Sequence, residues 1–174
     1  MLRTTAVSPR GSGATSDGTG SPEDHQGTAR RGYGVIPVHG YDIGAAAVLC
    51  MLDSVDGDGS RARGLHPGEP IPFGLQPVLV SPTTVYGTVL VETILRGWPP
   101  AGLPRPWLVL LADIPAKPAS AARYRLRVLS SRLAGTVALP YLPALRAVER
   151  PEDALNDPTV ARAAAQLRRQ LEGP

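Results

Sequence analysis

The sequence has a single cysteine, Cys50, and a single lysine, Lys117, among its 174 residues. One cysteine excludes an internal disulfide framework and is typical of a reducing compartment. No segment reaches the roughly 18 uncharged apolar residues that a membrane helix needs, and the N-terminal segment lacks the apolar stretch of a secretory signal. The sequence therefore predicts a cytoplasmic protein with no membrane partner.

Large apolar side chains are scarce in residues 1–32, which are rich in Gly, Ser, Thr and charged residues. Such a segment buries too little surface to offset the entropy lost on ordering. We therefore predict a disordered N-terminal arm over residues 1–32. The remaining residues suffice for one compact domain.

Metal ligands and nucleophiles are equally sparse. The three histidines, at positions 25, 39 and 66, lie in separate contexts, and one cysteine gives no zinc-binding spacing. Cys50 lies in the apolar run "AAAVLCML", which predicts a small buried side chain. The stretch "DSVDGDGS" lacks the closing glutamate of a calcium loop, and we interpret it as a flexible acidic loop. No metal site and no catalytic residue is predicted.

Apolar segments with the pattern of a strand alternate with segments that have the pattern of a helix along the rest of the chain. We predict strands at 35–38, 77–80, 107–112 and 136–140, and helices at 44–52, 82–96, 119–134 and 159–171. Residues 53–74 are full of helix and strand breakers and predict a loop without a strand. Alternation of this kind predicts an α/β fold, a three-layer Rossmann-like domain with a mostly parallel sheet.

Local signals set the expected helix ends and buried faces. Ser81-Pro82 resembles a helix start, and Gly135 is expected to end the helix at 119–134. Each of the last two helices has one apolar face, formed by Ala122, Leu126, Leu129 and Leu133 and by Val160, Ala164, Leu167 and Leu171.

The segment "HGYDIGAA", residues 39–46, follows the first strand at the place where a nucleotide-binding fold builds its phosphate loop. Gly40 and Gly44 allow a tight turn, but the segment has neither the lysine nor the Ser/Thr that phosphate and Mg²⁺ require. Tyr41 adds bulk, and Asp42 would repel an anion. The pattern favours a strand-to-helix turn without a ligand.

Three segments, taken in order, resemble the ParA/MinD-type P-loop ATPases, whose deviant Walker A pattern is KGGxGK[ST]. The first is the strand and loop beginning at "GVIPVHG"; the others are "PVLVSPTTVYGTVLVETIL" and "WLVLLADIPAKP" with the following helix and the closing "LPYLPALR". The chain is more similar still to a group of uncharacterised actinobacterial proteins often linked to mobile elements. The resemblance implies a ParA/MinD-like domain at 33–151 and a C-terminal helical extension at 152–174.

The chain departs from that family where catalysis would need it to agree. The Walker A lysine and Ser/Thr are missing, and so is the Walker B strand with its carboxylate. By its order in the chain, Asp113 corresponds to the family's base-recognition loop. The resemblance therefore implies a degenerate nucleotide site at most, formed by Gly40, Tyr41, Asp42, Gly44, Asp113 and Lys117, and argues against an enzyme.

Three functional hypotheses follow. The first is a non-catalytic P-loop-like binding or scaffolding protein with a protein partner, no cofactor, and a role that the resemblance places in plasmid or mobile-element maintenance or transfer. Its active surface would be the carboxyl edge of the sheet, at residues 39–44, 81–84 and 113–117. The second is a nucleotide-binding protein with slow hydrolysis, binding ATP without a well-formed Mg²⁺ site, with Lys117 or an arginine supplied in trans replacing the missing lysine. The third is a basic accessory protein that binds DNA through Arg123, Arg125, Arg127 and Arg132.

Overall fold

The computed structural model describes residues 32–40, 42–53 and 60–173. The predicted disordered arm, apart from Gly32, lies outside the described residues, as do Tyr41 and most of the "DSVDGDGS" segment.

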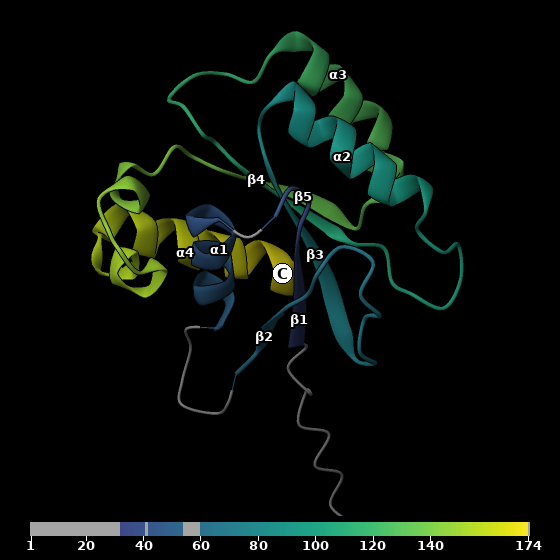
Figure 1. Ribbon diagram of the computed structural model, residues 1–174, viewed down its shortest axis with the longest axis horizontal. Helices are drawn as coiled ribbons and strands as arrows, with labels where there is room; N and C mark the ends of the chain where they lie inside the picture. Colours follow the sequence, from purple (N-terminus) through teal and green to yellow (C-terminus); the bar gives the residue numbers. More distant parts are fainter. Residues whose placement is uncertain (1–31, 41, 54–59, 174) are drawn as a thin grey trace, which may run out of the picture.

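A five-stranded, all-parallel sheet forms the middle layer (Figure 1). Its strands lie in the order β2-β1-β3-β4-β5, with bounds β1 Gly32–Pro37, β2 Ala62–Gly64, β3 Leu75–Pro82, β4 Trp107–Leu111 and β5 Gly135–Leu139. From β1 the chain first adds β2 on one side, and it then returns to add β3, β4 and β5 on the other side. The direction in which strands are added therefore reverses between β1 and β3. In open parallel sheets, ligands bind outside the carboxyl ends of the strands at such a point.

Helices cover both faces of the sheet (Figure 1). Two buried clusters join the helices to the strands: one contains residues of α1 and α4, the other residues of α2 and α3. The helices are α1 Ile43–Asp53, α2 Val85–Arg96, α3 Ser120–Leu129 and α4 Pro158–Glu172. The predicted three-layer, Rossmann-like α/β fold is confirmed.

Helix α2 begins later than the sequence predicts. Ser81 and Pro82 continue β3, where they pair with Leu110 and Leu111 of β4. The helix cap is Thr84 instead, whose hydroxyl accepts a hydrogen bond from the Gly87 amide at 2.9 Å. The predicted start at Ser81-Pro82 is therefore wrong, because strand pairing decides the conformation at these two residues.

Helix α3 ends earlier than predicted. It stops at Leu129 and a short 3-10 turn, Ser130–Arg132, continues it. Gly135 does not close the helix but is the first residue of β5, opposite Trp107. A β-carbon at Gly135 would overlap the Trp107 ring, so this glycine leaves room for the indole.

Residues 53–74 contain a strand that the sequence analysis did not predict. The three residues of β2 pair in parallel with β1, from Tyr33 opposite Ala62 to Val35 opposite Gly64. Asp53, the last residue of α1, holds the start of this strand. Its Oδ1 accepts hydrogen bonds from the Ser60 hydroxyl at 2.8 Å and from the backbone amides of Arg61 at 2.7 Å and Ala62 at 3.2 Å.

The Asp53 contacts predict a pH dependence of stability. Burial alone would raise the pKa of Asp53, but hydrogen bonds from the Ser60 hydroxyl and from the amides of Ala62 and Arg61 outweigh it and lower the pKa. A carboxylate with a lowered folded-state pKa contributes stability that is present above its unfolded pKa and is lost as the pH falls through the folded value. We expect Asp53→Ala to cost about 1 kcal/mol at neutral pH.

Chemical denaturation between pH 7 and pH 3 measures this effect. The difference in unfolding free energy between wild type and Asp53→Ala is expected to shrink as the pH falls below the ordinary aspartate pKa of about 3.9. Exposed Glu149, which makes none of the described ion pairs, provides the control Glu149→Ala. A difference for Asp53→Ala that stays constant with pH would contradict the assigned contacts.

The C-terminal helix, α4, shares one hydrophobic core with α1 and the sheet. The predicted face of α4, formed by Val160, Ala164, Leu167 and Leu171, is buried. Arg168 Nη1 also donates to the Met51 carbonyl near the end of α1, at 2.6 Å. Residues 158–172 therefore cover the sheet beside α1.

Candidate functional site

The predicted site residues that the structure describes follow β1 and β4, at the carboxyl edge of the sheet. The backbone amide of Thr83, after β3, donates to the carbonyl of Leu111 in β4, and its hydroxyl donates to Asp113 Oδ1 at 3.2 Å. On the other side of β3, the amide of Val38 donates to the carbonyl of Val80. The loops after β1, β3 and β4 thus border one edge, as parallel strands require.

Asp42 occupies the amino end of α1. Its Oδ1 accepts a hydrogen bond from the Ala45 amide at 2.8 Å, and its backbone carbonyl accepts from the Ala46 amide at 3.0 Å. This is N-cap geometry, in which a side-chain oxygen partners a helix amide that would otherwise be free. The Ala45 amide, at the positive end of the helix dipole, is one of those that would receive a phosphate.

His39 contacts the same carboxylate from the other side. Its Nε2 lies 3.2 Å from Asp42 Oδ2, so each oxygen of Asp42 has a partner within the turn. Gly40 has a φ of +103°, a left-handed conformation that favours glycine, and its side-chain position is open. Gly40 is therefore explained by the turn itself. Tyr41 lies outside the described residues.

Gly44 is explained by packing against β4. A β-carbon placed on Gly44 would lie 2.5 Å from Leu111 Cδ2 and 3.3 Å from Asp42 Oδ1. In a phosphate loop a glycine is valuable because it lets a ligand approach the backbone. Here the Leu111 side chain takes that space, and the glycine lets α1 pack closely over the sheet.

Asp113 is also engaged by its own chain. Besides the bond from Thr83 to its side chain, its backbone carbonyl accepts a hydrogen bond from Arg146 Nη2 at 2.9 Å. The Arg146 guanidinium in turn lies 5.5 Å from the centre of the Tyr141 ring, a cation–π distance. Arg146 is a residue that the sequence analysis did not single out as a site residue; it ties the loop after β4 to the segment after β5.

Lys117 is exposed, and it takes part in none of the ion pairs found among the described residues. It makes no ion pair with Asp42. Of the six predicted site residues, the structure thus links Gly44 to Asp42 within the first turn and connects Asp113 to the neighbouring loop through Thr83.

Cys50 is half-buried rather than buried as predicted. Burial, together with the charges of Glu152 and Asp53, raises the pKa of its thiol. A protonated thiol is a weak nucleophile. No group of three or more His, Cys, Asp or Glu side chains that could hold a metal ion occurs in the described part of the chain.

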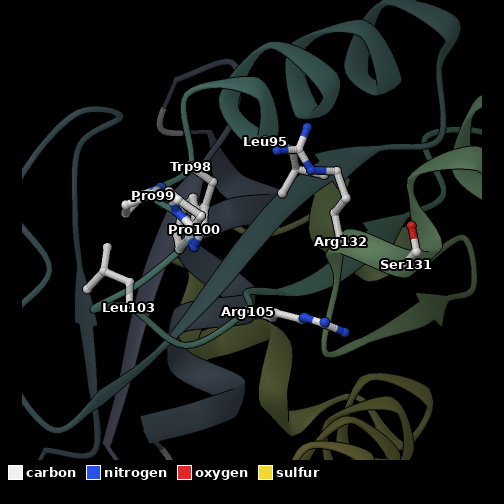
Figure 2. A pocket seen from close by; sticks show the side chains of 8 residues that line it. All are labelled: Leu95, Trp98, Pro99, Pro100, Leu103, Arg105, Ser131 and Arg132. Carbon is white, nitrogen blue, oxygen red and sulfur yellow. The ribbon is translucent and has the colours of Figure 1, made fainter.

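A hollow of about 230 Å³ lies at the opposite, amino edge of the sheet (Figure 2). Trp98 and the two prolines after it form one wall, and Arg105 and Arg132 come from other segments. The Trp98 indole N–H donates to the Pro104 carbonyl at 3.3 Å. Because α2 ends at Arg96 beside this hollow, the negative end of its dipole favours cationic side chains here.

The four arginines predicted as a DNA-binding set have different surroundings. Arg125 Nε lies 2.8 Å from Glu92 Oε2 of α2, in an ion pair that also includes Arg96. Arg123, Arg127 and Arg132 are exposed.

None of the helices in the described residues is long and apolar enough to span a membrane.

Comparison of the chain with protein-family models, with curated proteins and with solved structures finds no match.

Proposed function

We propose that this chain is a non-catalytic P-loop-like α/β domain that acts as a binding or scaffolding protein. The observation that carries the proposal is the placement of Asp42. Its carboxylate accepts a hydrogen bond from the Ala45 amide, one of the helix amides that would otherwise bind phosphate, and it carries the charge that a phosphate would bring. An anion entering the turn would have to displace this carboxylate and would find no lysine in the turn to compensate.

The other strand ends support the same proposal. The side chain of Asp113 is bonded to Thr83, and its carbonyl to Arg146. The space beside Gly44 is filled by Leu111. Polar groups that already have partners within the chain gain little from a small polar ligand. The resemblance to ParA/MinD-type domains and to the actinobacterial mobile-element group implies the process in which the protein acts. That process is plasmid or mobile-element maintenance or transfer.

A thermal-shift titration of the full chain with ATP, ADP and GTP, with and without Mg²⁺, tests the proposal. A ligand that binds only the folded state stabilises it by about 2.7 kcal/mol at a concentration of 100 Kd. We expect no change in Tm at millimolar nucleotide. A concentration-dependent rise of several degrees would contradict the proposal.

The variants Asp42→Ala and Lys117→Ala sharpen this titration. Loss of the cap is expected to lower the stability of Asp42→Ala by about 1 kcal/mol, by the same amount with and without nucleotide. If nucleotide stabilises the wild type and Lys117→Ala abolishes the effect, the second hypothesis is correct, with Lys117 replacing the missing lysine.

A further inference from the structure

The outer surface of α2 and α3 collects exposed apolar side chains. Seven large apolar residues among those described are exposed, and five of them lie on these two helices: Val85, Tyr86, Val89, Tyr124 and Val128. Tyr124 and Val128 are 70% and 59% exposed. Contiguous exposed apolar surface marks interaction sites, and Tyr124 and Val128 are neighbours on one face of α3.

Four of the five exposed residues follow helical spacing on the two sides of the seam between α2 and α3. Val85, Val89 and Glu92 recur at intervals of four and three along α2, and Tyr124 and Val128 are four apart on α3. Residues at these spacings share one helix face. The two stripes meet where Glu92 Oε2 contacts Arg125 Nε at 2.8 Å, which places Glu92 and its neighbours at the seam.

A hollow of about 310 Å³ lies along this seam. It is lined by Glu92, Ala121, Tyr124, Arg125, Val128 and Leu129. The ten residues of α3 extend about 15 Å, which is enough to contact two to three turns of another helix. We call this surface the α2–α3 groove.

The charged side chains of α3 are all basic. Helix α3 contains three arginines and no acidic residue, and Arg132 follows it. The one acid of α2, Glu92, is already paired with Arg96 and Arg125. Arg123 and Arg127 are exposed and make none of the ion pairs found in the described part of the chain. Charge complementarity therefore selects an acidic partner.

Building on the proposed scaffolding function, we propose that the α2–α3 groove binds an acidic amphipathic helix of a partner protein. Apolar residues of that helix at positions i, i+3, i+4 and i+7 pack against Tyr124 and Val128, as in other helix-in-groove complexes. A carboxylate of that helix pairs with Arg127, which lies three residues after Tyr124 and therefore beside it on α3. DNA would satisfy the arginines but would leave Tyr124 and Val128 without an apolar partner, which favours a protein over a nucleic acid.

Fluorescence anisotropy with the full chain tests this proposal. The probe is a labelled synthetic helical peptide of about 18 residues, with leucine on one face and glutamate flanking it. A scrambled peptide of the same composition and a short DNA duplex are measured in parallel. We expect saturable binding of the amphipathic peptide, at least about tenfold tighter than that of the scrambled peptide and of the duplex.

Variants locate the binding surface. We expect Val128→Ser and Arg127→Glu each to weaken binding of the peptide about tenfold or more, because the first removes an apolar contact and the second reverses a charge. The control is Arg162→Glu on α4, where the replaced arginine is exposed on the other face of the sheet, and it is expected to leave binding unchanged. Thermal unfolding confirms that each variant is folded.

Several results would overturn the proposal. These are no saturable binding at millimolar peptide, equal binding of the scrambled peptide, tighter binding of the duplex, or equal losses for Arg127→Glu and Arg162→Glu. Tighter duplex binding that depends on Arg127 would establish the DNA-binding alternative. None of these outcomes changes the nucleotide titration, so a failure here is distinguishable from a failure of the proposed non-catalytic function.

Discussion

Replacing Leu167 by alanine is expected to lower the free energy of unfolding by about 3 kcal/mol. The Leu167 side chain is fully buried between α4 and the rest of the core, in the cluster that includes Val48, Met51 and Val137. The substitution removes buried apolar surface and leaves a cavity, and both effects are unfavourable. Arg168 on the same helix also donates to the Met51 carbonyl, so α4 is attached to α1 beside the substituted position.

Urea unfolding followed by circular dichroism measures this change. Gln166→Ala is the matched control, because Gln166 is exposed on the same helix and its loss is expected to change stability by less than about 0.5 kcal/mol. If Leu167→Ala instead unfolded in two steps, with the sheet retaining wild-type stability, then α4 would be an independent extension rather than part of one cooperative core.

Gly87→Ala is expected to lower the unfolding free energy by about 2 kcal/mol. A β-carbon at this position would lie 2.7 Å from the Pro82 carbonyl oxygen and 2.6 Å from Ser81 Oγ. Within a helix, alanine is more favourable than glycine by about 1 kcal/mol. This gain does not remove the overlap, because Pro82 is paired in the sheet opposite Leu111 and cannot move away. The helix must therefore shift off β3, and the packing beneath it weakens.

Gly97→Ala is the control for this substitution. Gly97 has a φ of −82°, and a β-carbon there would lie at an ordinary 3.7 Å from the nearest neighbour, the Ile94 carbonyl. We expect this variant to be as stable as wild type to within about 0.5 kcal/mol. Equal effects of Gly87→Ala and Gly97→Ala would contradict the close approach of α2 to the end of β3.

The sequence was sufficient to predict the fold class because its signals are repeated. Each of β1, β3, β4 and β5 is an apolar run followed by a helical segment, and α4 buries the four residues that its spacing predicts. Strand β2 was missed because three residues between breakers carry no periodic signal. Its position depends on the hydrogen bonds from Ser60, Arg61 and Ala62 to Asp53, which link residues seven to nine positions apart.

The turn at the start of α1 was predictable from the sequence, but its contacts were not. The spacing of Gly40 and Gly44 identified a turn, and Asp42 was recognised as unfavourable for an anion. The contact of Gly44 with Leu111 could not be predicted, because it depends on how α1 packs over a strand 67 positions away in the sequence. The α2–α3 groove also depends on tertiary packing, since Glu92 and Arg125 are separated by 33 residues.

The central claim is that the chain's own carboxylate fills the phosphate position at the start of α1. Amide NMR of the full chain during a titration with ATP and Mg²⁺ tests it most directly, because the Ala45 amide is the group that donates to Asp42. We predict that the Gly44 and Ala45 resonances do not move at millimolar nucleotide, and that the Ala45 resonance moves in Asp42→Ala without any ligand. Saturable nucleotide-dependent shifts at Gly44 and Ala45 in the wild type would contradict the claim.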